Sequence, residues 1–180
     1  STNGSITMIN QEAEASQLES VGDVVQSLEV WEDKLIVLVN NSHKMMIYSI
    51  TEDGLSLPGI EISTDNSSPR EMVIVDDKIY FTNWDTQDVK VFNLFNYAIE
   101  ESIPVGASPE GIITDGFSLW VANSGENTVS EISLSSLDVR THEIGDGPQS
   151  MTIHDGDLYI SRRFYDESWN EFHGSSKIDF

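Results

Sequence analysis

Cysteine is absent from this sequence, which excludes disulfide bonds, thiol catalysis and cysteine-ligated metals but does not fix the redox compartment. Basic residues are scarce, since 9 Lys and Arg stand against 31 Asp and Glu, for a formal net charge of −22. A field of that sign repels nucleic acids and anionic lipids, so we expect neither as a partner. No run of about 18 apolar residues occurs, and no membrane span is expected.

Helical periodicity and catalytic motifs are also lacking. No window keeps apolar residues at i, i+3, i+4 and i+7, which argues against coiled coils and helical repeat arrays. The sequence contains no GxSxG, no HExxH and no glycine-rich phosphate loop. Asp76-Asp77 and Asp155-Gly156-Asp157 are typical of hairpin turns rather than of calcium loops. The histidines are scattered: His43, His142, His154 and His173. We therefore expect no metal site, no cofactor and no assignable catalytic residue.

The sequence does contain a repeat, best seen in SPEGIITDGFSLWVANSGENTVSEISL, residues 108–134. Pro69, Pro109 and Pro148 mark its period, with spacings of 40 and 39 residues. In each unit an apolar run, a turn such as Asp115-Gly116, a second β-rich run and an alternating run follow one another. Four strands of about six residues with turns of about four need roughly 40 residues, the length of one propeller blade. The predicted fold is an all-β propeller of four-stranded antiparallel blades.

The repeat divides the chain into about 4.5 blades. Residues 1–23 form the last two strands of one blade, and three full blades cover residues 24–67, 68–107 and 108–146, followed by an incomplete blade at 147–180. Three alternatives remain: the chain continues in a longer propeller, copies complete one another in a homo-oligomer, or a four-bladed ring closes with one strand displaced. We favour the first of these.

The segment LWVANSGENTV, residues 119–129, resembles the YVTN-type β-propeller repeat. Ile79 to Asn83 and Leu158 to Ser161 are looser copies, and the resemblance extends from about Val24 to the C-terminus. This repeat type includes surface-layer-associated and periplasmic seven-bladed propellers, so it implies an extracellular or periplasmic protein. A start at Ser1 without methionine or signal peptide suggests a processed or excised product. The resemblance implies a fold but hardly a function, since one scaffold can host many activities.

Functional residues are expected just after the second strand of each blade, where Asn40, Trp84, Asn123 and Arg162 are taken as equivalent. Loops that a rigid scaffold presents together are common binding sites. In the fourth unit, Ser161 to Gly174 replaces the short turn that Ala122 to Asn127 forms in its neighbour. The predicted ligand-binding residues are Trp84, Asn123, Arg162, Arg163, Tyr165, Trp169 and His173.

Guanidinium groups suit carboxylate or phosphate, and aromatic rings suit a sugar, a peptide or a partner surface. We therefore expect a non-enzymatic binding or scaffold propeller that recognises a protein, glycan or surface polymer. A purely structural role for these residues is the alternative to ligand binding. In that role the arginines pair with Asp166, Glu167 and Glu171 while the aromatic rings cap the blade. The alternative function is a propeller-type lyase or lactonase-like enzyme, with His173 and Tyr165 as acid and base and the Arg162–Arg163 pair as anion clamp. The histidines do not recur at equivalent positions, which favours binding.

Overall fold

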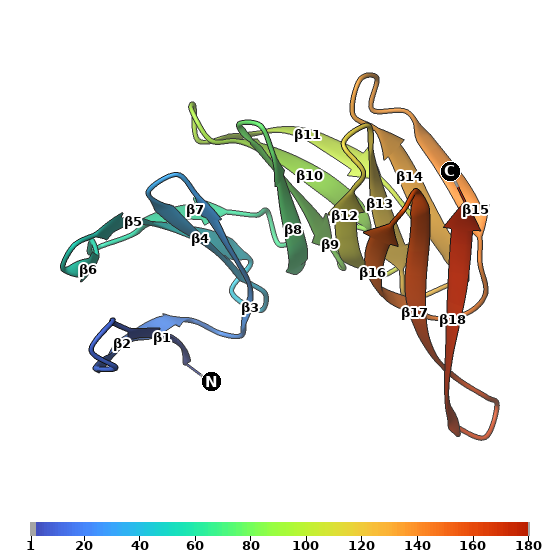
Figure 1. The fold of residues 1–180 in the computed structure, drawn as a ribbon, viewed down its shortest axis with the longest axis horizontal. Coiled ribbons are helices and arrows are strands. Elements are labelled where there is room, and N and C mark those ends of the chain that lie inside the picture. The colour runs from blue at the N-terminus through green and yellow to red at the C-terminus, as the bar shows by residue number, and fades with distance from the viewer. Residues whose placement is uncertain (1–2, 180) are drawn as a thin grey trace. The chain divides into compact units, whose positions relative to one another are not determined.

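The computed structural model describes residues 3–179, and the chain divides into two compact units, Ser1–Pro69 and Arg70–Phe180 (Figure 1). Residues 3–179 form β-strands and turns without any helix, so they include no helix able to cross a membrane. The strands pair with antiparallel neighbours throughout this range.

The first unit contains a two-stranded sheet and a larger sheet built around β4 and β5. Its strands are β1 (Gly4–Ile9), β2 (Ala15–Gly22), β3 (Val25–Trp31), β4 (Lys34–Val39), β5 (Lys44–Thr51), β6 (Gly54–Leu55) and β7 (Ile60–Ser63). The larger sheet has the order β3-β4-β5, with β7 and the short β6 both paired to β5. The last strand, β7, begins at Ile60, after Pro58, which has no N–H to give to a strand ladder.

The second unit contains three sheets in chain order. The first sheet comprises β8 (Pro69–Val75), β9 (Lys78–Asn83), β10 (Asp88–Asn93) and β11 (Ala98–Pro104). The second comprises β12 (Pro109–Thr114), β13 (Ser118–Asn123), β14 (Thr128–Ser133) and β15 (Val139–Glu143). The third comprises β16 (Pro148–His154), β17 (Asp157–Tyr165) and β18 (Glu171–Asp179). Together with the sheets of the first unit, these confirm the prediction of four-stranded antiparallel blades.

The repeat prolines open the first strand of each of these sheets. Pro69, Pro109 and Pro148 are the first residues of β8, β12 and β16. The residue before each of them has a left-handed backbone, with φ of 54° at Ser68, 48° at Ser108 and 64° at Gly147. The chain therefore bends in the same way each time it enters a new sheet, which keeps equivalent side chains at one edge.

The core of the second unit lies between successive sheets. β12 contacts β9 of the sheet before it and β16 of the sheet after it. Val89, Val91 and Tyr80 pack with Val121 and other apolar residues of β13 and β14. On the other face of that sheet, Trp120 and Val129 pack with Leu158 and Ile160 of β17. Both faces of β13 are therefore buried, as its continuous apolar sequence indicates.

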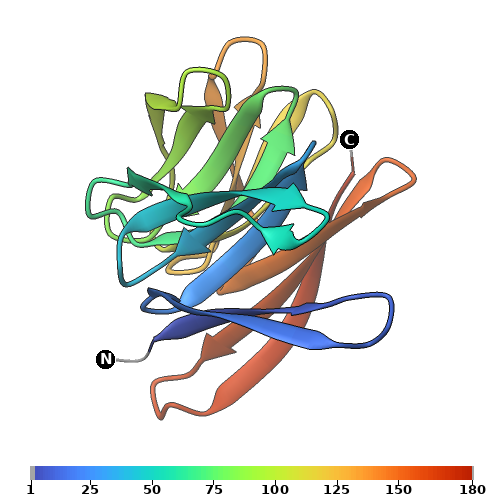
Figure 2. The same ribbon diagram turned by 90° about the vertical axis from the view of Figure 1, so that its left-hand side faces the viewer.

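The segment Ser161 to Gly174 was predicted as an inserted loop, and this prediction is wrong for most of it. The pairing of β17 with β18 continues from Asp157↔Asp179 to Tyr165↔Glu171, so the segment lengthens a hairpin (orange and red in Figure 2). Phe164 and Phe172 face one another in this extension with stacked rings 5.7 Å apart, and such cross-strand pairs stabilise a sheet. Only the turn after Tyr165 leaves the strands.

Asp166 organises that turn. Its carboxylate accepts hydrogen bonds from the Asn170 side-chain and main-chain N–H groups and from Ser168 N–H, at 2.8–2.9 Å. These hydrogen bonds, with those from Asn170 first, hold the pKa of Asp166 below its ordinary value despite the opposing effect of burial. The turn is therefore a defined structure at the tip of the β17–β18 hairpin.

Candidate functional site

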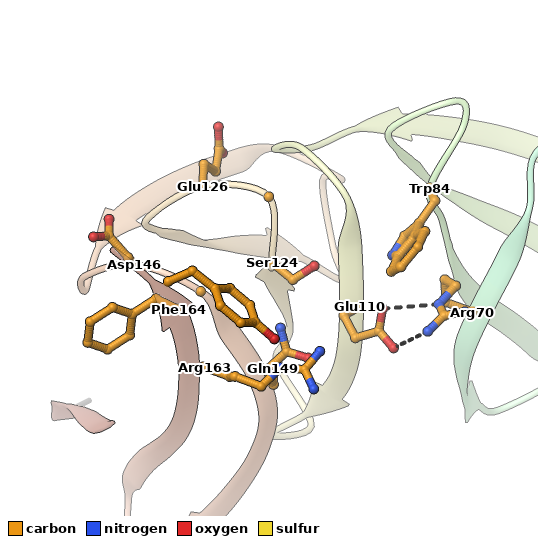
Figure 3. A pocket seen from close by; sticks show the side chains of 12 residues that line it. Arg70, Trp84, Glu110, Ser124, Glu126, Asp146, Gln149, Arg163 and Phe164 are labelled. Carbon is orange, nitrogen blue, oxygen red and sulfur yellow. Dashed lines mark hydrogen bonds and ion pairs between the residues drawn. The ribbon is translucent and has the colours of Figure 1, made fainter. Parts of the chain in front are cut away.

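A pocket of about 450 Å³ lies in the second unit and is lined by two sets of equivalent positions from its three sheets (Figure 3). Each residue of the first set directly follows a repeat proline. Each residue of the second set lies one position beyond the part of the second strand that is common to all three sheets. The first set is Arg70, Glu110 and Gln149, and the second is Trp84, Ser124 and Arg163. Both sets keep the spacings of 40 and 39 residues that define the repeat. The backbone repeats at this edge while the side chains differ.

The same main-chain hydrogen bond holds two members of the second set, Ser124 and Arg163, in place. Ser124 N–H donates to the carbonyl of Ser108 at 3.1 Å, and Arg163 N–H donates to the carbonyl of Gly147 at 2.8 Å. Both carbonyls belong to the left-handed residues that precede the repeat prolines. In the second and third sheets of this unit, the entry bend therefore determines where the pocket residue beyond the second strand lies.

Arg70, Glu110 and Trp84 form a connected group on one side of the pocket. Arg70 donates to both carboxylate oxygens of Glu110, from Nε at 3.0 Å and from Nη2 at 2.7 Å, and both side chains are largely buried. The Arg70 guanidinium also lies 4.1 Å from the centre of the Trp84 ring. Paired and stacked guanidinium groups are well ordered. This side of the pocket is thus rigid before any ligand arrives.

The backbone of Glu110 is anchored as well. The hydroxyl of Thr82, on β9, donates to the Glu110 carbonyl at 2.7 Å and also accepts from Glu71 N–H at 3.1 Å. This hydroxyl joins the first two sheets of the unit. At the next junction, Gly111 leaves room for the Gln149 backbone, whose carbonyl oxygen would collide with any Cβ at that position.

The other side of the pocket comes from the β17–β18 hairpin and from two acidic residues. Arg163, Phe164 and Tyr165 line it from β17, and the facing segments contribute Gly125, Glu126, Asp146 and Gly147. Glu126 accepts from the Thr128 hydroxyl at 2.7 Å. Figure 3 shows Arg163 and Gln149 directed into the pocket, with Glu126 and Asp146 on the side away from Arg70. The pocket therefore has a guanidinium and an amide at its centre and carboxylates at one end.

The structure brings three of the predicted ligand-binding residues together. Trp84, Arg163 and Tyr165 all line the pocket, although they come from β17 and from the first sheet. The four others lie outside its lining: Asn123, Arg162, Trp169 and His173. Ligand binding by these four stays a prediction.

Asn123 and Arg162 pair with the repeat prolines Pro109 and Pro148 and are turned inward. Asn123 is fully buried and donates from Nδ2 to the hydroxyls of Thr128 and Ser130 at 2.9 and 3.0 Å. Arg162 lies over the Phe164 ring at 5.4 Å, and its Nε is buried without a hydrogen-bond partner among the described residues. Neither side chain is among those that line the pocket.

Trp169 and His173 belong to the outer part of the long hairpin. Trp169 is exposed in its turn, with its ring 6.2 Å from that of Tyr165. The His173 side chain is 73% exposed, and its Nε2 lies 3.5 Å from a carboxylate oxygen of Glu171. Both side chains are mostly exposed to solvent.

The expected equivalence of Trp84 with Asn123 is wrong by one residue. Asn83 pairs with Asp88 at the end of β9 as Asn123 pairs with Thr128 at the end of β13, so Trp84 corresponds to Ser124 and Arg163. The sequence reasoning also missed Arg70, Glu110 and Gln149. The sequence does mark these three positions, since each directly follows a repeat proline. Glu126 and Asp146 lacked any such mark.

The arrangement can bind polar and charged groups. Among residues 3–179 no three His, Asp or Glu side chains gather as a metal-ligand set would. The pocket offers the Arg163 guanidinium, the Gln149 amide and the Ser124 hydroxyl as hydrogen-bonding groups, with aromatic rings at its sides. Such a mixture is typical of a ligand site on a rigid scaffold.

No protein-family model and no curated protein matches the sequence of this chain. Solved structures do resemble it. A computationally designed protein, Ika4, matches with a TM-score of 0.64 and 9% identity over 84% of this chain and 91% of its own. Hydrazine synthase of Kuenenia stuttgartiensis matches with a TM-score of 0.68 and 18% identity over 86% of this chain and 49% of its own. The chain thus spans about half the length of that neighbour.

A proposed 6-phosphogluconolactonase from Bacteroides uniformis matches with a TM-score of 0.67 and 12% identity, over 98% of this chain and 66% of its own. At these identities the likeness shows the fold alone. Propeller-type proteins are among these neighbours, and together with the sheets they confirm the fold class. The chain is an all-β propeller of four-stranded antiparallel blades, with about 4.5 blades present.

Proposed function

We propose that this chain is a non-enzymatic binding or scaffold propeller with YVTN-type repeats, which recognises a protein, glycan or surface polymer at the pocket. The observation that carries the proposal is the pocket itself, built from two equivalent positions in three successive sheets. The backbone repeats there while the side chains change from Arg to Glu to Gln and from Trp to Ser to Arg. A regular frame with varied side chains at one edge suits recognition.

The fixed arrangement of the side chains on one side of the pocket supports the same proposal. The Arg70–Glu110 pair and the Arg70–Trp84 stack hold one side of the pocket in a single arrangement. Groups that are already fixed lose little conformational freedom when a ligand binds. We also propose that the protein is exported, on the basis of its repeat type and its content of Ser, Asn, Asp and Thr.

The enzymatic alternative draws on the likeness to the proposed lactonase of Bacteroides uniformis and on the positively charged side chain of Arg163 in the pocket. Its acid and base were expected to be His173 and Tyr165. Tyr165 lines the pocket, but His173 lies on β18 outside the lining and is mostly exposed. Glu110, the most enclosed carboxylate of the pocket, already accepts two hydrogen bonds from Arg70. These contacts favour binding over catalysis.

The test is a glycan array of neutral, acidic and amino sugars, together with purified cell-wall polysaccharide. We expect the full chain to bind a subset of these probes and the Trp84→Ala, Arg163→Ala variant to lose that binding. The matched control is Phe117→Ala, Arg140→Ala, which removes an exposed aromatic ring and an exposed arginine elsewhere in the same unit.

A parallel assay follows the hydrolysis of glucono-δ-lactone in a pH-stat. Turnover above the spontaneous rate that the Trp84→Ala, Arg163→Ala variant loses would establish the enzymatic alternative and contradict a binding role. Binding that survives in this variant would show that the pocket is not the recognition site.

A further inference from the structure

Arg163 differs from most basic residues of this acidic chain. Its Nε lies 3.9 Å from the nearest oxygen of Glu171, beyond hydrogen-bond distance, and its side chain is 53% exposed. Five other basic residues lie within 2.9 Å of a carboxylate oxygen: Lys34, Lys44, Arg70, Lys78 and Lys177. With 31 acidic residues in the chain, a loosely held arginine inside a pocket is a group that can take an anion from solution.

The neighbours of Arg163 fit a carboxylate in particular. Arg163 points into the pocket beside Gln149 (Figure 3), so a fork of guanidinium N–H groups and one amide face the same space. A guanidinium can hold the two oxygens of a carboxylate at once. Glu110 does not compete strongly for Arg163, because both of its oxygens accept from Arg70.

The rest of the pocket fits a sugar better than a protein surface. Its volume of about 450 Å³ lies in the range of small-ligand sites. A stable protein interface instead needs about 800 Å² from each partner. The exposed rings of Trp84 and Tyr165 offer apolar faces, while Ser124 adds a hydroxyl. Flat apolar surface beside convergent polar groups matches a pyranose ring, which carries both kinds of surface.

The acidic end of the pocket orients such a ligand. Glu126 and Asp146 are exposed carboxylates at the end of the pocket away from Arg70, and they repel a carboxylate placed beside them. A ligand carboxylate is therefore directed to Arg163. The net charge of −22 opposes this only weakly at physiological salt, where charges are screened over about 8 Å.

We propose that the pocket binds a carboxylate-bearing glycan, with a uronate carboxylate on Arg163 and its ring against Trp84 or Tyr165. This inference rests on the proposed function, because it names the ligand class of the same pocket. The probe is a trimer of galacturonic acid, titrated into the full chain by calorimetry in about 0.15 M salt. Its methyl ester is the matched neutral probe.

Wild-type protein is expected to bind the trimer and to bind the ester at least about tenfold more weakly, because the ester cannot form the charged hydrogen bonds. Arg163→Gln, which keeps an amide and loses the charge, is expected to weaken binding of the trimer by a similar factor. The matched control is Arg140→Gln, since Arg140 is 76% exposed and its Nη1 lies 4.0 Å from Glu131, outside the pocket. Binding by this control should change less than about twofold. Unfolding curves verify that each variant is folded.

Four outcomes would overturn the inference. They are equal binding of the trimer and its ester, equal binding of triglutamate, tighter binding of a glucosamine trimer, and no binding of any of these probes. If the glycan array is positive while one of these outcomes holds, the ligand class is wrong and the binding function stands. If the array is also negative, the proposed function itself fails for glycans and surface polymers.

Discussion

The second and third sheets of the Arg70–Phe180 unit begin alike and end differently. Every residue of β13 is buried, whereas β17 alternates between buried and exposed positions. Trp120 of β13 is 2% exposed, and its equivalent on β17, Tyr159, is 40% exposed. The two strands hold similar apolar sequences. Burial in this fold is thus decided by what packs on each face of a sheet, not by the strand alone.

The two sheets also separate at a defined residue. Ser124 and Arg163 make the same hydrogen bond to the residue before the repeat proline. Beyond it, Gly125 and Glu126 turn the chain in the second sheet, while Phe164 continues in strand pairing with Phe172 in the third. The backbones of the two sheets therefore diverge one residue after this shared hydrogen bond, at the edge of the pocket.

The largest expected difference between the two sheets is in the stability lost when the central aromatic residue of each is replaced by alanine. Trp120→Ala should lower the free energy of unfolding by about 3–5 kcal/mol, because it empties a buried site between two sheets. Tyr159→Ala, the matched change on β17, should cost less than about 1 kcal/mol because its ring is partly exposed. Urea unfolding measures both. Similar losses would show that the open face of β17 is covered in solution.

The junction between the two sheets gives the second prediction. Gly111→Val on β12 places a side chain against the Gln149 carbonyl and should cost about 1–3 kcal/mol, as overpacking does. Ser150→Val, at the equivalent position of β16, should stay within about 0.5 kcal/mol, because Ser150 is exposed. Thermal unfolding of both variants decides this. A tolerated valine at position 111 would mean that β12 and β16 can separate at little cost.

The sequence was sufficient to predict the blades and only part of the pocket. Pro69, Pro109 and Pro148 recur with the period of one sheet, so the strand order could be predicted. The extended hairpin could not, because the polar residues of Ser161 to Gly174 alternate too weakly to distinguish strands from a loop. The ion pair of Arg70 with Glu110 joins two sheets 40 residues apart, and only the three-dimensional register shows that these side chains meet.

That ion pair supplies the third prediction. A double-mutant cycle of Arg70→Ala and Glu110→Ala should give a coupling of about 1–2 kcal/mol in urea unfolding, because the pair is bidentate and largely buried. The matched cycle in the third sheet is Lys177→Ala with Asp157→Ala, a more exposed pair that should show smaller coupling. Equal couplings in the two cycles would contradict the view that the pocket side is specially ordered.

The smallest effect concerns the turns that join the first two strands of each sheet. Asp115 accepts from the N–H groups of Phe117 and Ser118 at 2.7 Å and from Trp120 Nε1 at 2.8 Å. Burial alone would raise the pKa of Asp115, but these hydrogen bonds, with that of Trp120 the strongest, outweigh it and lower the pKa. The corresponding turn before β17 holds the exposed Asp155 instead.

A carboxyl group whose pKa is lower in the folded state stabilises the fold above its unfolded pKa of about 3.9, and this stabilisation disappears as pH falls through the folded pKa. Asp115→Asn should therefore destabilise the protein most near pH 7 and progressively less below pH about 4. Thermal unfolding between these pH values measures the difference, with Asp155→Asn as the control that should differ less from wild type. A loss in Asp115→Asn that is the same at low and neutral pH would show that the charge of Asp115 is not what stabilises this turn.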